Sequence, residues 1–402
     1  MSVETQAGRV PTLTELLERI GDVGPILERN TDETERNRRV VDENIEALTA
    51  AGAFKVTVPR RFGGFEMSLR DKLEVSAAVG EHCGSTAWVV ALINVCNWMA
   101  SLLPDKGREE IFADTPDVKV AGVLNATQDV RKADGGFVVS GSWPWASGSW
   151  HADWALLGIA IVDDQGAEID QALAFVPMSE VSIEETWFVA GMKGTGSNTM
   201  VAEEVFIPEH RMYSVSRALE GVYACEHPDG EPSYRSSFMP LLTLILVGPQ
   251  LGMGRAALRF VEERAPKRGI TYTKFERQTD SVAFQLQIAR AATMIDGAHL
   301  HAFRAADDVD QTAAAMESMP YLRRARARAD AAYGIGQIKD AIDLLVSAHG
   351  ASSFAEVSPL QRIWRDSNTA ARHAVADLLV NQEIYGKARL GIPYEENITP
   401  LI

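Results

Sequence analysis

The chain has 402 residues, beyond the size at which one hydrophobic core stops growing, so we expect two or three domains. Its 39 basic and 55 acidic residues give a formal net charge of −16, which argues against nucleic acid or an anionic membrane as a partner. The three cysteines form no CxxC pair, and the N-terminus lacks the apolar segment of a signal peptide. These features favour a cytoplasmic protein with free thiols.

Residues 12–115 carry apolar side chains at steps of three and four, the period of amphipathic helices. Thr12, followed by Glu15, has the spacing of a capping box and predicts the start of the first helix. The uncharged run "CGSTAWVVALINVCNWMASLLP" at 83–104 is long enough to span a bilayer. Because it contains several polar residues, it predicts a helix buried inside the protein.

The pattern changes near residue 117. Short segments rich in Val, Ile, Phe and Trp are separated by Gly, Asp, Asn and Pro, which predicts strands at about ten-residue spacing. Such strands favour a small antiparallel barrel or sandwich. The predicted strands cover 118–125, 135–143, 151–162, 171–178, 181–191 and 200–208.

The helical period returns at about residue 232 and lasts almost to the end. A second uncharged run, at 236–254, contains two prolines and a glutamine and also predicts a buried helix. Four long segments with alanine-rich faces follow and predict a four-helix bundle, at 254–269, 282–309, 319–350 and 358–391. The expected fold is therefore α+β, with an N-terminal helical domain (1–116), a central β-domain (117–231) and a C-terminal bundle (232–402).

Several familiar site motifs are absent from the sequence. No GxGxxG opens a helix after a strand, and GxxxxGK[ST], HExxH and GxSxG do not occur. The eight histidines show no metal-ligand spacing, so no metal site is expected. One stretch does stand out: "SGSWPWASGSWHADW" at 140–154 contains four of the eight tryptophans, set among small residues. Large flat rings beside small residues suit a wall against which a flat ligand lies.

The order of helices, strands and helices resembles the acyl-CoA dehydrogenase fold over essentially the whole chain. Four local matches carry the resemblance: "GSWPWASG" at 141–148, "GMKGTGSNTMVAEEVFIP" at 191–208, "LVGPQLGMGRAAL" at 246–258 and "HGASSFAEVSPLQRIWRDSNTAARH" at 349–373. Each is moderately specific, and their order along the chain is that of the family.

A true acyl-CoA dehydrogenase needs a carboxylate base. In most members a Glu follows the Asp of "RD", but here "DSNTAARHA" offers none after Asp366, and the alternative helix "PLLTLILVGP" has no Glu. The chain more closely resembles the oxygenase components of two-component (group D) flavin-dependent monooxygenases, through "WASG" and "HADW", "CGSTAW" at 83–88 and His373. That resemblance implies reduced flavin (FMNH2 or FADH2) from a separate NAD(P)H:flavin reductase, and hydroxylation of a small molecule by O2 through a C4a-hydroperoxyflavin.

The resemblance also implies site residues and a homotetramer. Ser147 would hold the flavin N5 proton, and His373 would act on the bound oxygen and contact the substrate. Further flavin contacts would come from Trp145, Gly148, Thr195, Ser197, Arg268, Arg277, Ser352 and Ser353. Substrate contacts would come from Trp88, Cys96 and Asn97, the latter two near the place where phenol-hydroxylating members carry a His.

Without that His, the substrate remains open between an aromatic or heteroaromatic molecule and an amine or sulfur compound. The sequence also does not choose between FMN and FAD. Two other functions stay open: an acyl-CoA dehydrogenase or oxidase with a displaced base, and a non-catalytic member of the fold.

Overall fold

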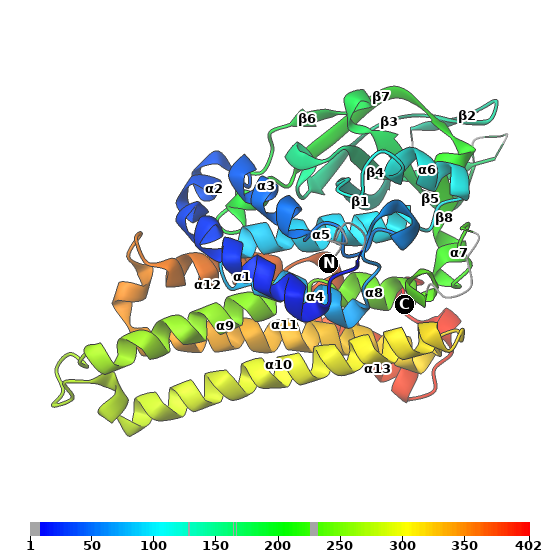
Figure 1. Ribbon diagram of the computed structural model, residues 1–402. Coiled ribbons are helices and arrows are strands. Elements are labelled where there is room, and N and C mark those ends of the chain that lie inside the picture. The colour runs from blue at the N-terminus through cyan, green and yellow to red at the C-terminus, as the bar shows by residue number, and fades with distance from the viewer. Residues whose placement is uncertain (1–8, 128, 164, 166, 226–231) are drawn as a thin grey trace, which may run out of the picture.

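The structure is a computed structural model that describes residues 9–127, 129–163, 165, 167–225 and 232–402. Six α-helices come first, two β-sheets follow, and long helices complete the chain (Figure 1). The sheets lie on one side of the N-terminal helices and the long C-terminal helices on the other (Figure 1). The first six helices are α1 Leu13–Arg29, α2 Thr31–Asn37, α3 Asp42–Ala51, α4 Leu69–Gly80, α5 Gly84–Ala100 and α6 Asp105–Phe112.

The start of α1 confirms the predicted capping box. The Thr12 side chain accepts a hydrogen bond from the Glu15 backbone N–H, and the Glu15 carboxylate accepts one from the Thr12 N–H. Two of the backbone donors that a helix start leaves unpaired are satisfied in this way.

Both uncharged runs form buried helices, as predicted. In α5 every residue except Leu92 is buried, and Leu92 is half-buried. The second run forms α8 (Phe238–Leu244) and the first part of α9 (Val247–Arg264). Within the described residues, the helical stretch Phe238–Lys267 is long and apolar enough to cross a membrane, but 89% of its most apolar window is buried inside the protein. These helices are therefore the core against which the other elements pack.

Eight strands form two four-stranded sheets, ordered β1-β4-β5-β8 and β2-β3-β7-β6. The strands are β1 Val120–Thr127, β2 Val130–Ala133, β3 Gly136–Ala146, β4 Trp154–Val162, β5 Glu168–Pro177, β6 Ser182–Glu184, β7 Asn198–Pro208 and β8 Met212–Ser214. Apolar side chains from both sheets meet in one core, as in a sandwich.

Two details of the predicted β-domain are wrong. The sheets are not purely antiparallel, because β1 pairs with β4 in parallel. The chain leaves β1, forms β2 and β3 in the other sheet, and returns through this crossover to the starting end of β1. The strand expected over 181–191 is also limited to Ser182–Glu184, because the backbone N–H groups of Thr186 and Trp187 donate to the Asn198 side chain instead of a neighbouring strand.

The outer face of the first sheet packs against the helices. Paired positions in neighbouring strands point to the same side, so one face carries Gly122, Leu156, Leu173, Phe175 and Tyr213. Four of these side chains belong to the core that also contains residues of α5 and α8. A layer of apolar contacts thus joins the sheets to the helices at the level of α5.

The C-terminal region contains α10 Val282–Ala314, α11 Tyr321–His349, α12 Pro359–Ala370 and α13 Leu378–Arg389. The helices α9, α10 and α11 run side by side and extend beyond the sheets at one end (Figure 1). The prediction of one continuous helix over 358–391 is wrong. Helix α12 ends at Ala370 and α13 begins at Leu378, so His373 lies in the turn between them and not on a helix.

Candidate active site

Ser147 occupies a tight turn at the end of β3. The register of β3 against β7 shifts between Trp143 and Ala146, and Trp145 within this bulge adopts a left-handed backbone with φ 70°. Such a conformation is costly for a large side chain and is retained where the surroundings require it. Gly148 follows with φ 76°, and a Cβ there would lie 3.0 Å from the Val89 side chain. The turn therefore fits closely against α5 because residue 148 is a glycine.

A continuous chain of hydrogen bonds runs through the buried side chains of Ser147, Ser197 and Thr195. The Trp88 Nε1–H donates to Ser147 Oγ at 3.2 Å. Ser147 Oγ lies 2.7 Å from Ser197 Oγ, which lies 2.7 Å from Thr195 Oγ1. Thr195 Oγ1 in turn donates to the Met192 carbonyl oxygen at 2.9 Å.

The two ends of this chain fix its direction. A hydroxyl has one hydrogen, and the Thr195 hydrogen is used on the Met192 carbonyl. Ser197 must then donate to Thr195, and Ser147 must donate to Ser197. One lone pair of Ser147 Oγ accepts from the Trp88 indole. The remaining lone pair makes Ser147 an acceptor, without a spare hydrogen, toward a ligand at the turn.

Trp88 also contacts His373, the second predicted catalytic residue. The two ring centroids are 5.8 Å apart, with the ring planes tilted by 56°. The His373 side chain is solvent-accessible, yet surrounding protein desolvates the ring and lowers its pKa. The fold thus brings together three predicted residues, Trp88, Ser147 and His373.

The three predicted substrate residues of α5, Trp88, Cys96 and Asn97, do not all lie on the same side of the helix. Trp88, Leu92 and Cys96 follow one another at four-residue steps and share one side of the helix, with the half-buried Leu92 between two buried residues. Asn97 is fully buried and bonded to backbone: it donates to the Val118 carbonyl at 2.9 Å and accepts from the Val120 N–H at 3.1 Å. The structure therefore uses Asn97 to join α5 to β1.

Arg268 and Arg277, the two arginines predicted to contact the flavin, have different surroundings. The Arg268 guanidinium donates to Ser352 Oγ at 2.8 Å and lies 2.6 Å from His349 Nε2. Burial and this guanidinium lower the pKa of His349 to about 4, so the imidazole is a neutral partner. Arg277 instead pairs with Asp280 on the surface. Ser353 is fully buried and donates to the Val346 carbonyl, which leaves Ser352 as the exposed hydroxyl of this turn.

Two residues that the sequence did not single out support the turn. The Met192 carbonyl is the final acceptor of the hydroxyl chain, and the Met192 N–H donates to Asp366 Oδ1 at 2.5 Å. Burial raises the pKa of Asp366 to about 6. The neighbouring Arg362 and Arg365 pair with Asp32 and Glu35 of α2. Met192 lies within the 191–208 match, but the sequence does not distinguish its role, because its contribution comes from backbone groups.

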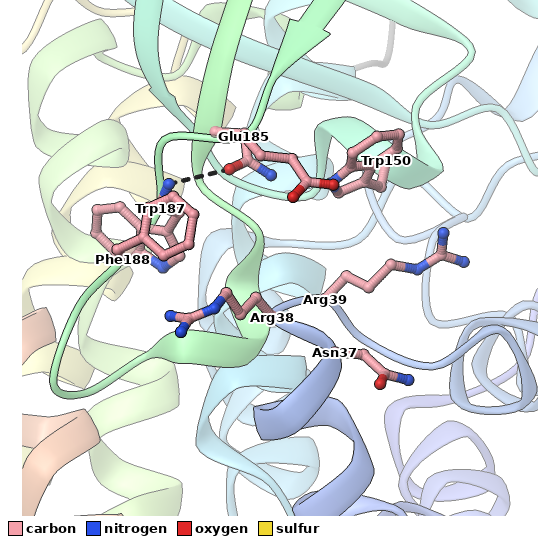
Figure 2. Close-up of a pocket in the computed structure, with 8 residues that line it drawn as sticks. Asn37, Arg38, Arg39, Trp150, Glu185, Trp187 and Phe188 are labelled. Carbon is pink, nitrogen blue, oxygen red and sulfur yellow. Dashed lines mark hydrogen bonds between the residues drawn. The ribbon is translucent and has the colours of Figure 1, made fainter.

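The structure also has three surface pockets. A pocket of about 150 Å³ beside the turn is lined by aromatic side chains and arginines: Trp187 and Phe188 lie opposite Trp150, with Arg38 and Arg39 at its edge (Figure 2). It is too small for a flavin ring system. A pocket of about 550 Å³ lies between α1, α2, α9 and α12, and one of about 320 Å³ lies between α9 and α10. None of the three pockets is lined by a predicted site residue.

Among the residues that the structure describes, no three His, Cys, Asp or Glu side chains lie close enough together to hold a metal ion. The groups available at the candidate site are therefore hydroxyls, an imidazole, an indole and backbone.

Comparison with known proteins shows the family of the chain. Residues 244–378 match the family "Acyl-CoA dehydrogenase, C-terminal domain". The flavin-dependent monooxygenase oxygenase subunit HsaA of Mycobacterium tuberculosis is 30% identical over 378 residues, covering 94% of this chain and 96% of that protein. The chain belongs to the flavin-dependent monooxygenases. XiaF from Streptomyces sp., solved in complex with FADH2 and glycerol, superposes on this monooxygenase with a TM-score of 0.90 and 36% identity, covering 95% of this chain and 96% of XiaF.

These findings confirm the predicted family, the acyl-CoA dehydrogenase-like fold and an oxidoreductase activity. This monooxygenase also resembles the FADH(2)-dependent resorcinol hydroxylase oxygenase component of Rhizobium sp., at 28% identity over 98% of both chains.

Proposed function

We propose that this enzyme is the oxygenase component of a two-component system that hydroxylates an aromatic or heteroaromatic small molecule with reduced flavin and O2. A separate NAD(P)H:flavin reductase would supply the flavin, and the enzyme would act in the cytoplasm as a homotetramer. The names of the relatives support this proposal, since they include an FADH(2)-dependent resorcinol hydroxylase and an indole-3-acetate monooxygenase.

The observation that carries the proposal is the direction of the hydroxyl chain at Ser147. Ser147 Oγ offers a lone pair and no hydrogen. In reduced flavin N5 carries a hydrogen that needs an acceptor, whereas in oxidised flavin N5 is itself an acceptor. Ser147 therefore matches the reduced form and opposes the oxidised form. The hydroxyl chain gives the protein a physical basis for selecting the redox state of its cofactor.

Other residues of the turn fit a flat cofactor. The Trp145 ring is 61% exposed at the end of β3, where it is free to lie against a planar molecule. Arg268 with Ser352 offers charged and hydroxyl donors for a phosphate. Reduced flavin, when bound, supplies the two electrons that activate oxygen. The protein would hold the N5 proton through Ser147, and the buried Trp88 ring beside Ser147 would keep water from that contact.

His373 would move a proton at the reacting oxygen. Its desolvated imidazole is neutral at pH 7, so one ring nitrogen carries a hydrogen to donate and the other can accept. Trp88 holds one side of the ring. A positioned acid–base group of this kind contributes about 10²–10⁴-fold to a rate.

The dehydrogenase alternative lacks a placed base. Asp366 is the carboxylate that this part of the sequence does contain. It is buried, and it accepts a hydrogen bond from the Met192 N–H. A base must reach the proton that it removes, and Asp366 would first have to give up this bond. This geometry favours the monooxygenase function over an acyl-CoA dehydrogenase.

The tetramer is supported by an apolar stripe on α10. Val282, Leu286 and Leu300 are 66%, 66% and 68% exposed in a single chain and recur on one side of the helix. Such a stripe on an acidic chain suits burial against a second subunit. In the resembling fold the turn at Ser352 serves the flavin of a neighbour, which would complete the cofactor site across that interface.

The test is a titration of the full-length enzyme with reduced and oxidised FAD and FMN under anaerobic conditions. Wild type should bind reduced flavin at least 10-fold more tightly than oxidised flavin. Thr195→Val removes the hydroxyl that fixes the chain direction, so Ser147 becomes free to donate and this preference should fall several-fold. Thr199→Val is the control, because its hydroxyl bonds to Thr186 and not to the chain. An unchanged preference in Thr195→Val would contradict the proposal.

A further inference from the structure

The pocket of about 150 Å³ beside the Ser147 turn, the aromatic pocket, takes no part in the proposed function. Trp150 forms one wall, and Trp187 with Phe188 forms the other (Figure 2). Two of these rings are open to solvent, since Phe188 is 66% and Trp150 is 39% exposed. Aromatic walls of this kind bury their faces when a flat molecule fills the space between them. A cavity of about 150 Å³ holds benzene, so the aromatic pocket has room for a single six-membered ring.

The walls of the aromatic pocket are fixed by their own contacts. The Trp187 Nε1–H donates to the Met192 carbonyl at 2.9 Å, and the Trp187 backbone N–H donates to Asn198 Oδ1 at 3.0 Å. On the other side, Trp150 Cδ1 lies 3.2 Å from the place where Gly196 would carry a Cβ, so the indole packs closely on this loop. A ligand would therefore meet walls that are already in place and would lose little affinity to ordering them.

Asn198 brings a buried donor to the aromatic pocket. The residue lines the pocket and is only 4% exposed. Its Oδ1 accepts from the backbone N–H groups of Thr186 and Trp187, both at 3.0 Å, and these two bonds identify the oxygen end of the amide. The Nδ2 group carries two hydrogens, and among the residues that the structure describes it has no acceptor. Buried donors usually have a partner, so this amide suits an acceptor atom on a ligand.

Glu185 places an acceptor near this donor. It directly precedes the two residues that Asn198 binds, and its side chain extends toward Trp150 (Figure 2). Within the described part of the chain, no hydrogen-bond or ion-pair partner lies against the Glu185 carboxylate. A donor amide beside an acceptor carboxylate suits a hydroxyl group, because a hydroxyl both accepts and donates.

Arg38 places a positive charge on the opposite side of the aromatic pocket from Glu185 (Figure 2). Its guanidinium carbon lies 4.6 Å from the centroid of the Phe188 ring. No carboxylate of the described residues pairs with Arg38, whereas the adjacent Arg39 pairs with Asp42. A guanidinium stacked on a ring keeps its N–H donors in plane, where a carboxylate binds them.

We propose that the aromatic pocket binds a phenolic acid with one ring. The ring lies between Trp150 and Trp187. The phenolic hydroxyl donates to Glu185 and accepts from Asn198, and the carboxylate pairs with Arg38. None of the residues assigned to flavin or catalysis lines this pocket, so the inference does not rest on the proposed function.

The first test compares 4-hydroxybenzoate with 4-hydroxybenzamide, which has the same shape and no charge. Calorimetry measures both affinities for the full-length enzyme without flavin. Wild type should bind the benzoate about 5-fold more tightly, the value of one charge-assisted hydrogen bond in a partly open site. Arg38→Gln should remove most of this preference. Arg36→Gln is the matched control: it removes the same charge from an exposed position in the last turn of α2, outside the pocket, and should keep the preference.

The second test concerns the hydroxyl end. Wild type should bind 4-hydroxybenzoate about 5-fold more tightly than benzoate, which lacks the hydroxyl. Glu185→Ala should reduce this second preference several-fold and leave the preference for a carboxylate intact. Glu184→Ala removes the same charge from the preceding exposed residue, which does not line the pocket, and should behave as wild type.

The inference is overturned if wild type binds none of the probes or shows neither preference. It is also overturned if Arg38→Gln keeps the preference for a carboxylate. His373→Ala should bind the probes as wild type does. Binding that is lost in His373→Ala and unchanged in Arg38→Gln and Glu185→Ala would place the probes at the candidate active site, and would contradict the inference. Failure of wild type to bind reduced flavin contradicts the proposed function alone.

Discussion

The indole of Trp88 faces the imidazole of His373 at 5.8 Å between ring centroids. The same indole donates its N–H to Ser147 at 3.2 Å. One side chain of α5 thus positions two groups that come from the β-domain and from the turn before α13. A change at Trp88 should therefore affect the proposed cofactor contact and the proposed acid–base group separately, depending on which part of the indole is lost.

Trp88→Phe keeps an aromatic ring beside His373 but removes the N–H that holds Ser147. Loss of one hydrogen bond is worth about 1 kcal/mol, so binding of reduced flavin should weaken about 5-fold. Equilibrium titration without oxygen measures this. The matched control is Trp98→Phe, since the Trp98 N–H donates to the Ser233 carbonyl and does not contact Ser147. Equal losses in both variants would show that the effect is a general destabilisation.

His373→Ala tests the acid–base assignment. The variant should bind reduced flavin as wild type does, because Ser147 and its hydroxyl chain are unchanged. Product formed per oxygen consumed should fall about 10²-fold, with hydrogen peroxide released instead. The measurement is this ratio, with an external flavin reductase supplied. His301→Ala, at a histidine paired with Asp330, is the control. A ratio that survives the loss of His373 would remove the residue from the mechanism.

Buried neutral histidines should make the enzyme less stable in acid. Burial lowers the pKa of His151 to about 4, and burial with Arg268 does the same for His349. Between pH 6.5 and 4 the unfolded chain therefore binds protons that the folded chain does not, so stability is present above pH 6.5 and is lost as the pH falls. Each such proton contributes up to about 1.4 kcal/mol per pH unit.

Asp366 acts in the opposite direction. Burial raises its pKa to about 6, so the folded chain binds one extra proton between that value and the unfolded value of 3.8. This offsets one of the two histidine protons over most of the window. In Asp366→Asn the side-chain oxygen still accepts the hydrogen bond from the Met192 N–H. The melting temperature of this variant should therefore fall more steeply than that of wild type as the pH is lowered from 6 to 4. Parallel curves for the two proteins would contradict this assignment.

The stripe on α10 predicts the site of subunit association. Leu286→Asp combined with Leu300→Asp places two charges on this exposed apolar surface and should convert the tetramer to smaller species. Light scattering at micromolar concentration measures the mass. Arg19→Asp, at an exposed position of α1, changes the net charge by the same amount away from the stripe and should leave the mass unchanged. A wild-type mass equal to one chain would refute the homotetramer itself.

The sequence alone was sufficient for the overall plan. The helical period before residue 116 and after 232, with strand segments between, predicted the order of elements, because local side-chain periodicity is set by which face of each element is buried. The capping box at Thr12 and the buried character of α5 were also predictable, since both depend on neighbours within one segment. The motifs around Ser147 and His373 were enough to indicate the family.

The tertiary structure decided what the sequence could not. The helix expected to carry His373 ends at Ala370, and the parallel pairing of β1 with β4 follows from a crossover that periodicity does not encode. The direction of the hydroxyl chain depends on the Met192 carbonyl, and the approach of His373 to Ser147 depends on Trp88, which contacts both. Both are properties of distances between segments far apart in the chain. A backbone carbonyl is common to every residue, so only its place in the fold makes the one at Met192 the acceptor that orients Ser147.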